Sequence, residues 1–166
     1  MTLSNENMIK RDRLRFTKNK LSANLAILAI VLNALYFVSI YKTDVGTYYY
    51  KLIIGISIVY NLLFMLAAFL SSEGVKAYKP GYSYLLIALG IGQIIRIFII
   101  PLQAKNATLV VDSVETHAME NGQFIRLCVY LILSAALCIL AGIINISKTR
   151  MLASRQAEIE RTQKGS

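Results

Sequence analysis

The sequence predicts an all-α, polytopic membrane protein: a four-helix transmembrane bundle with both termini in the cytoplasm. Three observations support this class. Hydrophobic residues make up 56% of the 166-residue chain, more than is usual for a soluble domain. They are grouped into four runs of about 20 residues, the length that crosses ~30 Å of hydrocarbon as a helix. The 18 lysines and arginines, against 9 acidic residues, lie mostly beside those runs, as membrane topology favours.

The four apolar runs define the expected spans. These are residues 21–41, 52–70, 82–102 and 124–146. Each is expected to be helical, because a strand in lipid leaves its backbone amides unpaired unless it closes a barrel, and the alternation that a barrel needs is missing. The chain then divides into a basic cytoplasmic N-terminal segment (1–20), a four-helix transmembrane domain (21–146) and a basic cytoplasmic tail (147–166).

The first apolar run follows a polybasic stretch, as the apolar region of a signal peptide does. It is longer than the roughly 7–15 residues of a cleavable signal, and no small-x-small cleavage site follows it. We expect an uncleaved anchor. A polybasic start followed by an uncleaved anchor is typical of a bacterial cytoplasmic membrane protein.

The distribution of lysine and arginine predicts the orientation, since cytoplasmic flanks accumulate these residues. Most of them lie before the first run, after the second and after the fourth, which places both termini inside. The N-terminal segment supplies the densest group, and we expect it to act as a topogenic signal and to contact anionic lipid headgroups. Its members are Lys10, Arg11, Arg13, Arg15, Lys18 and Lys20.

Polar residues within the spans are the candidate functional residues, because an unpartnered polar group in hydrocarbon costs several kcal/mol. By their depth in each span, Asn33, Asn61, Gln93 and Ser134 all lie within about one turn of the middle of the membrane. Arg96 follows Gln93 by three residues, so the two share a helix face. An arginine at this depth must contact protein or water rather than lipid.

The sequence leaves the role of this intramembrane polar group open. None of the four runs contains an aspartate or glutamate, so the acceptors for Arg96 within the spans are amides, hydroxyls, backbone carbonyls or water. One interpretation is a hydrogen-bonded core that fixes helix register. The others are that Arg96 binds an anionic ligand, or an acidic residue of another subunit.

Small residues repeat every four positions in two spans, a pattern typical of closely packed transmembrane helices. Ser134, Cys138 and Gly142 do so in the fourth span, and Ala88 and Gly92 in the third. We expect these ridges to pack within the bundle. Their use in a homodimer remains a second possibility.

The chain lacks the side chains that most enzymes need. His117, the single histidine, lies among Asp112, Glu115 and Glu120 in the loop before the fourth span, a composition more typical of a solvated surface than of a metal site. Zinc, phosphate-loop, serine-hydrolase and CxxC signatures are missing. We expect no catalytic residues, no cofactor, no metal and no nucleic-acid partner.

The leading hypothesis from sequence is a non-enzymatic accessory or scaffolding subunit of a larger membrane complex, such as a transporter, with Arg96 as a contact. Its partner is another membrane subunit or a second copy of the chain. The alternative is a ligand-binding or conducting bundle, which is dimeric in one version. In that bundle Arg96, Gln93, Asn33 and Asn61 line a cavity open to the outside and meet a small anionic solute.

Overall fold

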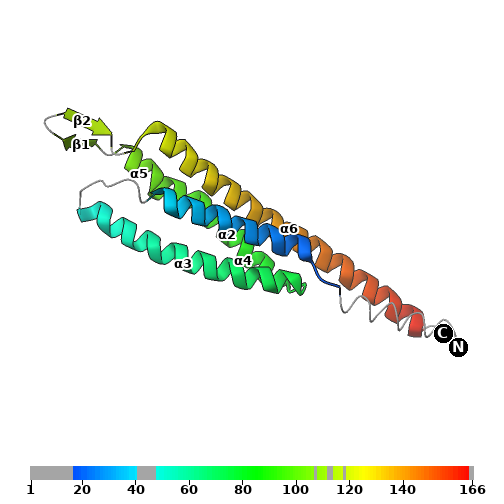
Figure 1. Cartoon of the computed structure of the whole chain (residues 1–166). Helices are drawn as coiled ribbons and strands as arrows, with labels where there is room; N and C mark the ends of the chain where they lie inside the picture. Colours follow the sequence, from blue (N-terminus) through cyan, green and yellow to red (C-terminus); the bar gives the residue numbers. More distant parts are fainter. Residues whose placement is uncertain (1–16, 41–47, 107, 112–113, 118, 165–166) are drawn as a thin grey trace.

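Four long helices packed side by side form the body of the molecule (Figure 1). The structure is a computed structural model that describes residues 17–40, 48–106, 108–111, 114–117 and 119–164. Within this part of the chain, four helices are long and apolar enough to cross a membrane. They are α2 (Lys20–Ile40), α3 (Tyr48–Lys76), α4 (Pro80–Ile99) and α6 (Asn121–Lys164).

Two of these helices extend well past the apolar runs from which they were predicted. Helix α3 begins before residue 52 and continues beyond residue 70 to Lys76. Helix α6 continues from the fourth apolar run through almost the whole basic tail. Hydropathy marks only the part of a helix that lies in lipid, whereas these ends contain polar residues that propagate a helix equally well.

Proline positions explain both ends of α4. Pro80 occupies the first turn, where its missing N–H would have no partner in any case. At the other end α4 stops at Ile99, because Pro101 lacks the N–H that would continue the helical hydrogen bonds. A short helix, α5 (Pro101–Asn106), continues the span after this break. The third predicted span, 82–102, therefore contains an interruption.

A small hairpin departs from the predicted all-α fold. Strands β1 (Thr108–Val111) and β2 (Val114–His117) pair antiparallel, with Thr108 opposite His117 and Val111 opposite Val114. The sequence analysis treated this segment as the loop before the fourth span. Valine and threonine are frequent in both segments, and such β-branched residues favour strands over helices.

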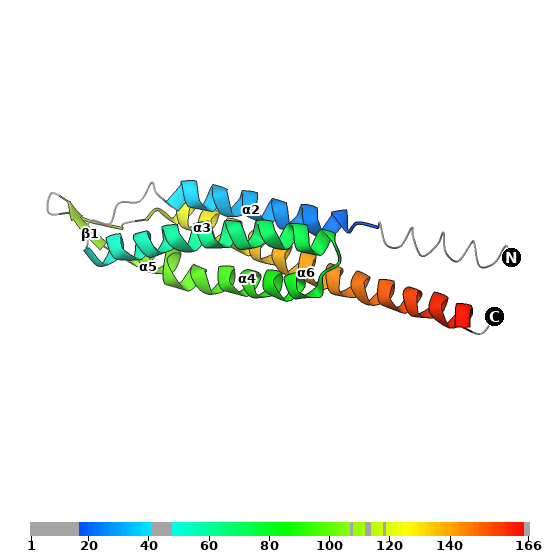
Figure 2. The same cartoon turned by 90° about the horizontal axis from the view of Figure 1, so that it is seen from below.

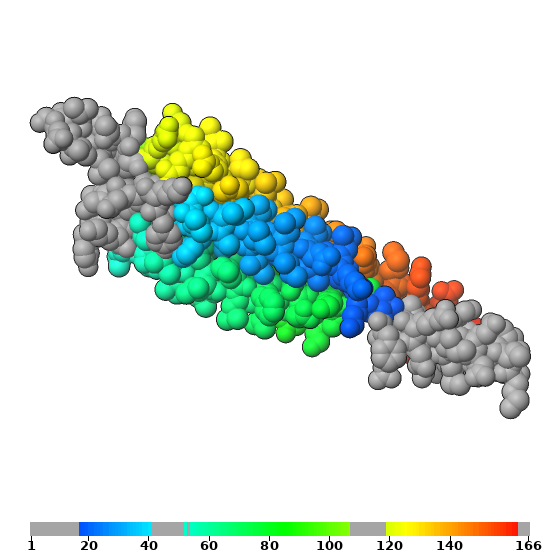
Figure 3. Space-filling model, viewed as in Figure 1, coloured from blue at the N-terminus to red at the C-terminus, as the bar shows by residue number. Residues whose placement is uncertain are grey.

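The helices are arranged so that α3 and α6 lie on opposite sides of the bundle. Helix α6 packs along both α2 and α4, whereas α3 packs against α2 and α4 and barely contacts α6. Figure 3 shows α2 between α6 and α3 on one face. The beginning of α2 and the end of α6 lie at the same end of the bundle, opposite the hairpin, and α6 projects beyond the other helices there (Figures 1 and 2).

Glycines allow α4 and α6 to approach closely. A Cβ added at Gly142 would lie 2.7 Å from the backbone oxygen of Ser83, and one added at Gly90 would lie 2.9 Å from that of Ala135. On α6, Ser134, Cys138 and Gly142 are buried as the predicted ridge requires. On α4 the prediction named the wrong face: Ala88 is exposed, and Gly90 makes the close contact.

Small side chains make up much of the interior, and many large apolar ones face outward. Ala26, Ala29 and Ala68 are completely buried, whereas Leu63 and Phe98 are more than half exposed. A soluble bundle reverses this arrangement, because water drives large apolar side chains inward. A surface of this kind suits contact with lipid, and it agrees with the length and hydropathy of the four helices.

Candidate functional site

The side chain of Arg96 lies in the interior, where three helices meet. It projects from α4, is only 4% exposed and donates hydrogen bonds to α2 and α3. One terminal nitrogen, Nη1, bonds to Oδ1 of Asn61 at 2.6 Å and to Oδ1 of Asn33 at 3.3 Å. The other, Nη2, bonds to Oγ of Ser57 at 2.6 Å. The guanidinium thus holds together the helices that carry these acceptors.

Gln93 and two tyrosines complete this site. Nε2 of Gln93 donates to Oδ1 of Asn33 at 3.0 Å. The guanidinium carbon of Arg96 lies 4.3 Å from the ring centre of Tyr36 and 5.0 Å from that of Tyr60, distances at which a cation is attracted to an aromatic face. We call the hydrogen-bonded residues the arginine cluster. Its members are Asn33, Ser57, Asn61, Gln93 and Arg96.

The arginine cluster is not saturated with hydrogen bonds. Nδ2 of Asn33, Nδ2 of Asn61 and Oε1 of Gln93 are buried and have no hydrogen-bond partner in the described part of the chain. Each such buried group costs about 1–3 kcal/mol. A network that served only to fix helix register would be expected to satisfy all its members.

Three neutral groups accept hydrogen bonds from the Arg96 guanidinium. They are two amide oxygens and a hydroxyl. In the described residues the one salt bridge joins Glu73 to Lys76, near the end of α3. The arginine cluster therefore presents a desolvated cation, a group that attracts an anion strongly in a medium of low dielectric constant.

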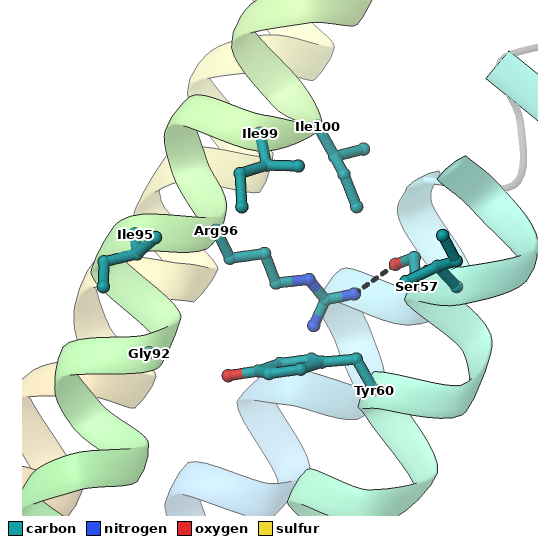
Figure 4. A pocket seen from close by; sticks show the side chains of 8 residues that line it. Ser57, Tyr60, Gly92, Ile95, Arg96, Ile99 and Ile100 are labelled. Atoms are coloured by element: carbon teal, nitrogen blue, oxygen red, sulfur yellow. Dashed lines mark hydrogen bonds between the residues drawn. The ribbon is translucent and has the colours of Figure 1, made fainter. Parts of the chain in front are cut away.

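A cavity of about 260 Å³ leads to Arg96 from the side of the bundle, between α3 and α4. Figure 4 shows Arg96 and Ser57 in it, with the Tyr60 ring on one side and Ile99 and Ile100 on the other. The remaining lining residues are Ile56, Gly92 and Ile95. Ile56 and Ile95 are 63% and 54% exposed on the apolar outer surface. The opening therefore faces laterally, whereas the sequence analysis placed it at the external end.

Gly92 lies where α4 contacts α3, whereas Gly90 lies where α4 contacts α6. A Cβ at Gly92 would lie 2.7 Å from the hydroxyl oxygen of Tyr60. The missing side chain therefore leaves room for the Tyr60 ring beside the guanidinium. Gly92 belongs to the cavity between α3 and α4.

Ser134, which was grouped with Arg96 by depth, lies elsewhere. Its hydroxyl donates to the backbone oxygen of Ala29 at 2.9 Å and connects α6 to α2. Its predicted depth was similar, but Ser134 lies on α6, which contributes no residue to the arginine cluster. Conversely, the sequence analysis missed Ser57, which precedes Asn61 by one helical turn and so shares its face.

A second buried polar network lies at the opposite end of the bundle from the hairpin, and the sequence analysis missed it. Asn19 donates to Oγ of Ser22 at 2.8 Å and to Oδ1 of Asn145 at 2.9 Å. Asn145 donates to Oγ of Ser83 at 2.7 Å, and Nζ of Lys148 donates to Oδ1 of Asn19 at 3.2 Å. These five residues form the asparagine cluster. It joins α2, α4 and α6.

The topogenic residues of the N-terminal segment are described only in part. Lys18 and Lys20 are exposed at the beginning of α2. Lys10, Arg11, Arg13 and Arg15 lie outside the described residues, as does Asp112 of the loop. His117 lies in β2, and in the described residues no group of three or more histidine, cysteine or acidic side chains is placed to hold a metal.

These features define the class of protein: a bundle of four helices that are apolar enough to cross a membrane, with a buried arginine beside a lateral cavity. Comparisons with protein-family models, with curated proteins and with solved structures find no match. The functional argument therefore rests on the site itself.

Proposed function

We propose that the protein is a non-catalytic membrane protein that binds an amphiphile from the lipid phase, through Arg96 and the cavity between α3 and α4. The observation that carries the proposal is the position of the Arg96 guanidinium. It is a buried cation that is bonded to neutral groups of α2 and α3, and it lies at the inner end of a cavity that opens on the apolar outer surface of the bundle.

The geometry supports a ligand with two chemically different parts. The isoleucines at the mouth offer only apolar contacts, so a water-soluble anion would lose its hydration there without compensation. Arg96, Ser57 and Tyr60 offer polar contacts at the inner end. An acidic head joined to a hydrocarbon chain matches both parts.

The size of the cavity limits how much of the ligand it holds. At about 260 Å³ it is slightly smaller than the roughly 300–1,000 Å³ of pockets that enclose a small molecule. The cavity therefore suits the head and the first carbons of a fatty acid, with the remainder of the chain lying among the lipids. The arginine cluster contributes donors and orientation but no general base or nucleophile of the usual kind.

Binding of oleate to the purified protein, followed by native mass spectrometry, tests this proposal, with oleyl alcohol as the uncharged probe. We expect the wild type to retain oleate in preference to the alcohol. Arg96→Gln should lose this preference, because it removes the charge while keeping a hydrogen-bonding group. Arg126→Gln, which alters an exposed arginine of α6, should retain it.

A second pair of variants blocks the cavity without altering Arg96. Ile95→Phe places a larger side chain at the mouth, whereas Ile94→Phe places the same side chain on a neighbouring exposed position outside the cavity. We expect only Ile95→Phe to weaken oleate binding. Equal binding by all four variants and the wild type would contradict the proposal.

An accessory subunit, the leading hypothesis from sequence, is tested in the same preparation. The cavity would then admit an acidic side chain from a partner helix in place of a free amphiphile. A membrane protein that copurifies in fixed ratio with the wild type, but not with Arg96→Gln or Ile95→Phe, would replace the amphiphile as the occupant. Absence of oleate binding together with such a partner favours this second function.

A further inference from the structure

A second cavity lies at the end of the bundle where α6 emerges, far from the arginine cluster along the helices. Its volume is about 220 Å³. It is lined by the turn between α3 and α4, by the segment just before α2, and by α6. The lining residues are Thr17, Tyr78, Lys148, Met151, Leu152 and Arg155.

Two cations of α6 face this cavity together. Lys148 and Arg155 are seven residues apart, so they lie on one face of the helix and are separated by about 10 Å along its axis. Leu152 lies between them on the same face. Among the described residues, no acidic side chain lines the cavity, and Glu158, one turn beyond Arg155, forms no salt bridge with another described residue. The cavity is therefore a site of net positive charge.

Hydrogen bonds fix the walls of this cavity before any ligand arrives. Lys148 is held by Oδ1 of Asn19 at 3.2 Å. Thr149 donates from Oγ1 to the backbone oxygen of Tyr78 at 3.4 Å, which connects α6 to the turn. Tyr78 adopts a left-handed backbone conformation with φ of 57°, which is unfavourable for a residue with a Cβ. The turn is thus held in one conformation against α6.

The position of the cavity relative to the apolar span indicates the ligand. Lys148 follows the last residue of the fourth apolar run, Ile146, by two positions, so it lies at the edge of the apolar span, and Arg155 lies about 10 Å farther along the helix. Met151, which is 54% exposed, and Leu152 add apolar surface beside them. Basic pockets at this level between transmembrane helices bind the phosphate of anionic lipids.

We propose that this cavity, the basic-end cavity, binds the phosphate group of an anionic phospholipid. The phosphate lies between Lys148 and Arg155, and the glycerol and upper acyl carbons contact Met151 and Leu152. This site is separate from the amphiphile site at Arg96, and the two proposals stand or fall independently.

The test compares lipid retention by the full-length protein after purification in a neutral detergent. Phosphatidylglycerol and phosphatidylcholine are added in turn, and bound lipid is counted by native mass spectrometry. The test variant is Lys148→Gln with Arg155→Gln. The matched control is Arg150→Gln with Arg161→Gln, which removes the same charge from exposed positions of the same helix extension outside the cavity.

We expect the wild type and the control to prefer phosphatidylglycerol, and the test variant to lose this preference roughly tenfold or more, because each cation near a headgroup contributes appreciable binding energy. Arg155→Gln alone should lose part of it; since no hydrogen bond of Arg155 is part of the asparagine cluster, its effect does not arise from misfolding. An equal loss in the control would show diffuse attraction by the helix charge and overturn the proposal.

The source of the phosphate is tested with a soluble competitor. Glycerol 3-phosphate carries the same phosphate chemistry without acyl chains. If the site takes a lipid, millimolar glycerol 3-phosphate should leave phosphatidylglycerol bound. Displacement of the lipid at that concentration would assign the site to a soluble phosphate compound and overturn the lipid assignment.

Discussion

The arginine cluster and the asparagine cluster are both buried polar networks that join three helices, yet they differ in two respects. In the asparagine cluster every buried side-chain nitrogen and oxygen has a hydrogen-bond partner, and its one cation, Lys148, lies at the edge. The arginine cluster has three unpartnered amide atoms and a cation at its centre. On our proposal, this difference separates a structural network, whose hydrogen bonds are complete, from a binding site, whose remaining donors and acceptor are left for a ligand.

The largest expected effect comes from breaking the complete network. Asn145→Leu removes the bonds to Asn19 and Ser83 and leaves polar groups of both residues buried with fewer partners. We expect a loss of about 2 kcal/mol or more in the free energy of unfolding, at roughly 1–3 kcal/mol for each group left unsatisfied. A titration with sodium dodecyl sulfate, followed by circular dichroism, measures it.

The stability of Asn145→Leu is to be compared with that of Gln93→Leu, the corresponding variant in the arginine cluster. Unchanged stability in Asn145→Leu would mean that the asparagine cluster does not hold the helices together, and the distinction between the two networks would be lost.

An intermediate effect is expected where glycine permits close packing. Gly142→Ala places a Cβ against the backbone oxygen of Ser83, which cannot move without shifting α4. Gly92→Ala places one against the hydroxyl of Tyr60, the far end of a side chain that can rotate. We expect Gly142→Ala to destabilise the protein by about 1–3 kcal/mol, the usual range for overpacking. Gly92→Ala should cost little or be offset by alanine's better helix propensity.

Thermal unfolding of these two variants in one detergent provides the measurement. Similar losses of stability in both would show that the α3–α4 contact is as rigid as the α4–α6 contact.

The smallest effect is expected for Gln93→Leu. This change removes an unpartnered buried oxygen, and Oδ1 of Asn33 keeps its bond from Arg96. The lost hydrogen bond and the removed desolvation penalty nearly cancel, so we expect a change within about 0.5 kcal/mol of zero. The same detergent titration serves here, and a loss as large as that of Asn145→Leu would place the arginine cluster with the structural networks.

Sequence patterns were informative about which segments form long apolar helices, and less informative about which residues contact one another. Hydropathy identified the four helices because lipid imposes a minimum apolar length on each. Depth along each span grouped Asn33, Asn61, Gln93 and Arg96, which the structure brings together. Depth does not specify the direction in which a side chain points around its helix, and this is why Ser134 was grouped with them although it bonds to α2 elsewhere.

The asparagine cluster and the hairpin could not be predicted from hydropathy or from depth along a span. Asn19 and Asn145 lie at the ends of apolar runs, where asparagine is ordinary, and only the packing of three helices makes them a network. Hydropathy does not distinguish β-branched residues from other residues of similar polarity, so it gives no signal for the hairpin. Two signals could have been used: Ser57 shares a helix face with Asn61, and Pro101 predicts the break in the third span.

The length of α6 has a mechanical consequence. Its 44 residues form one helix without a break, about 66 Å long at 1.5 Å per residue, which is roughly twice the thickness of the hydrocarbon layer. The first part of α6 packs against both α2 and α4, while its C-terminal part projects past the bundle. Because a continuous helix is stiff, a small tilt of the packed part produces a larger displacement at the C-terminal end of α6. In this respect α6 resembles a lever whose fulcrum lies near Asn145.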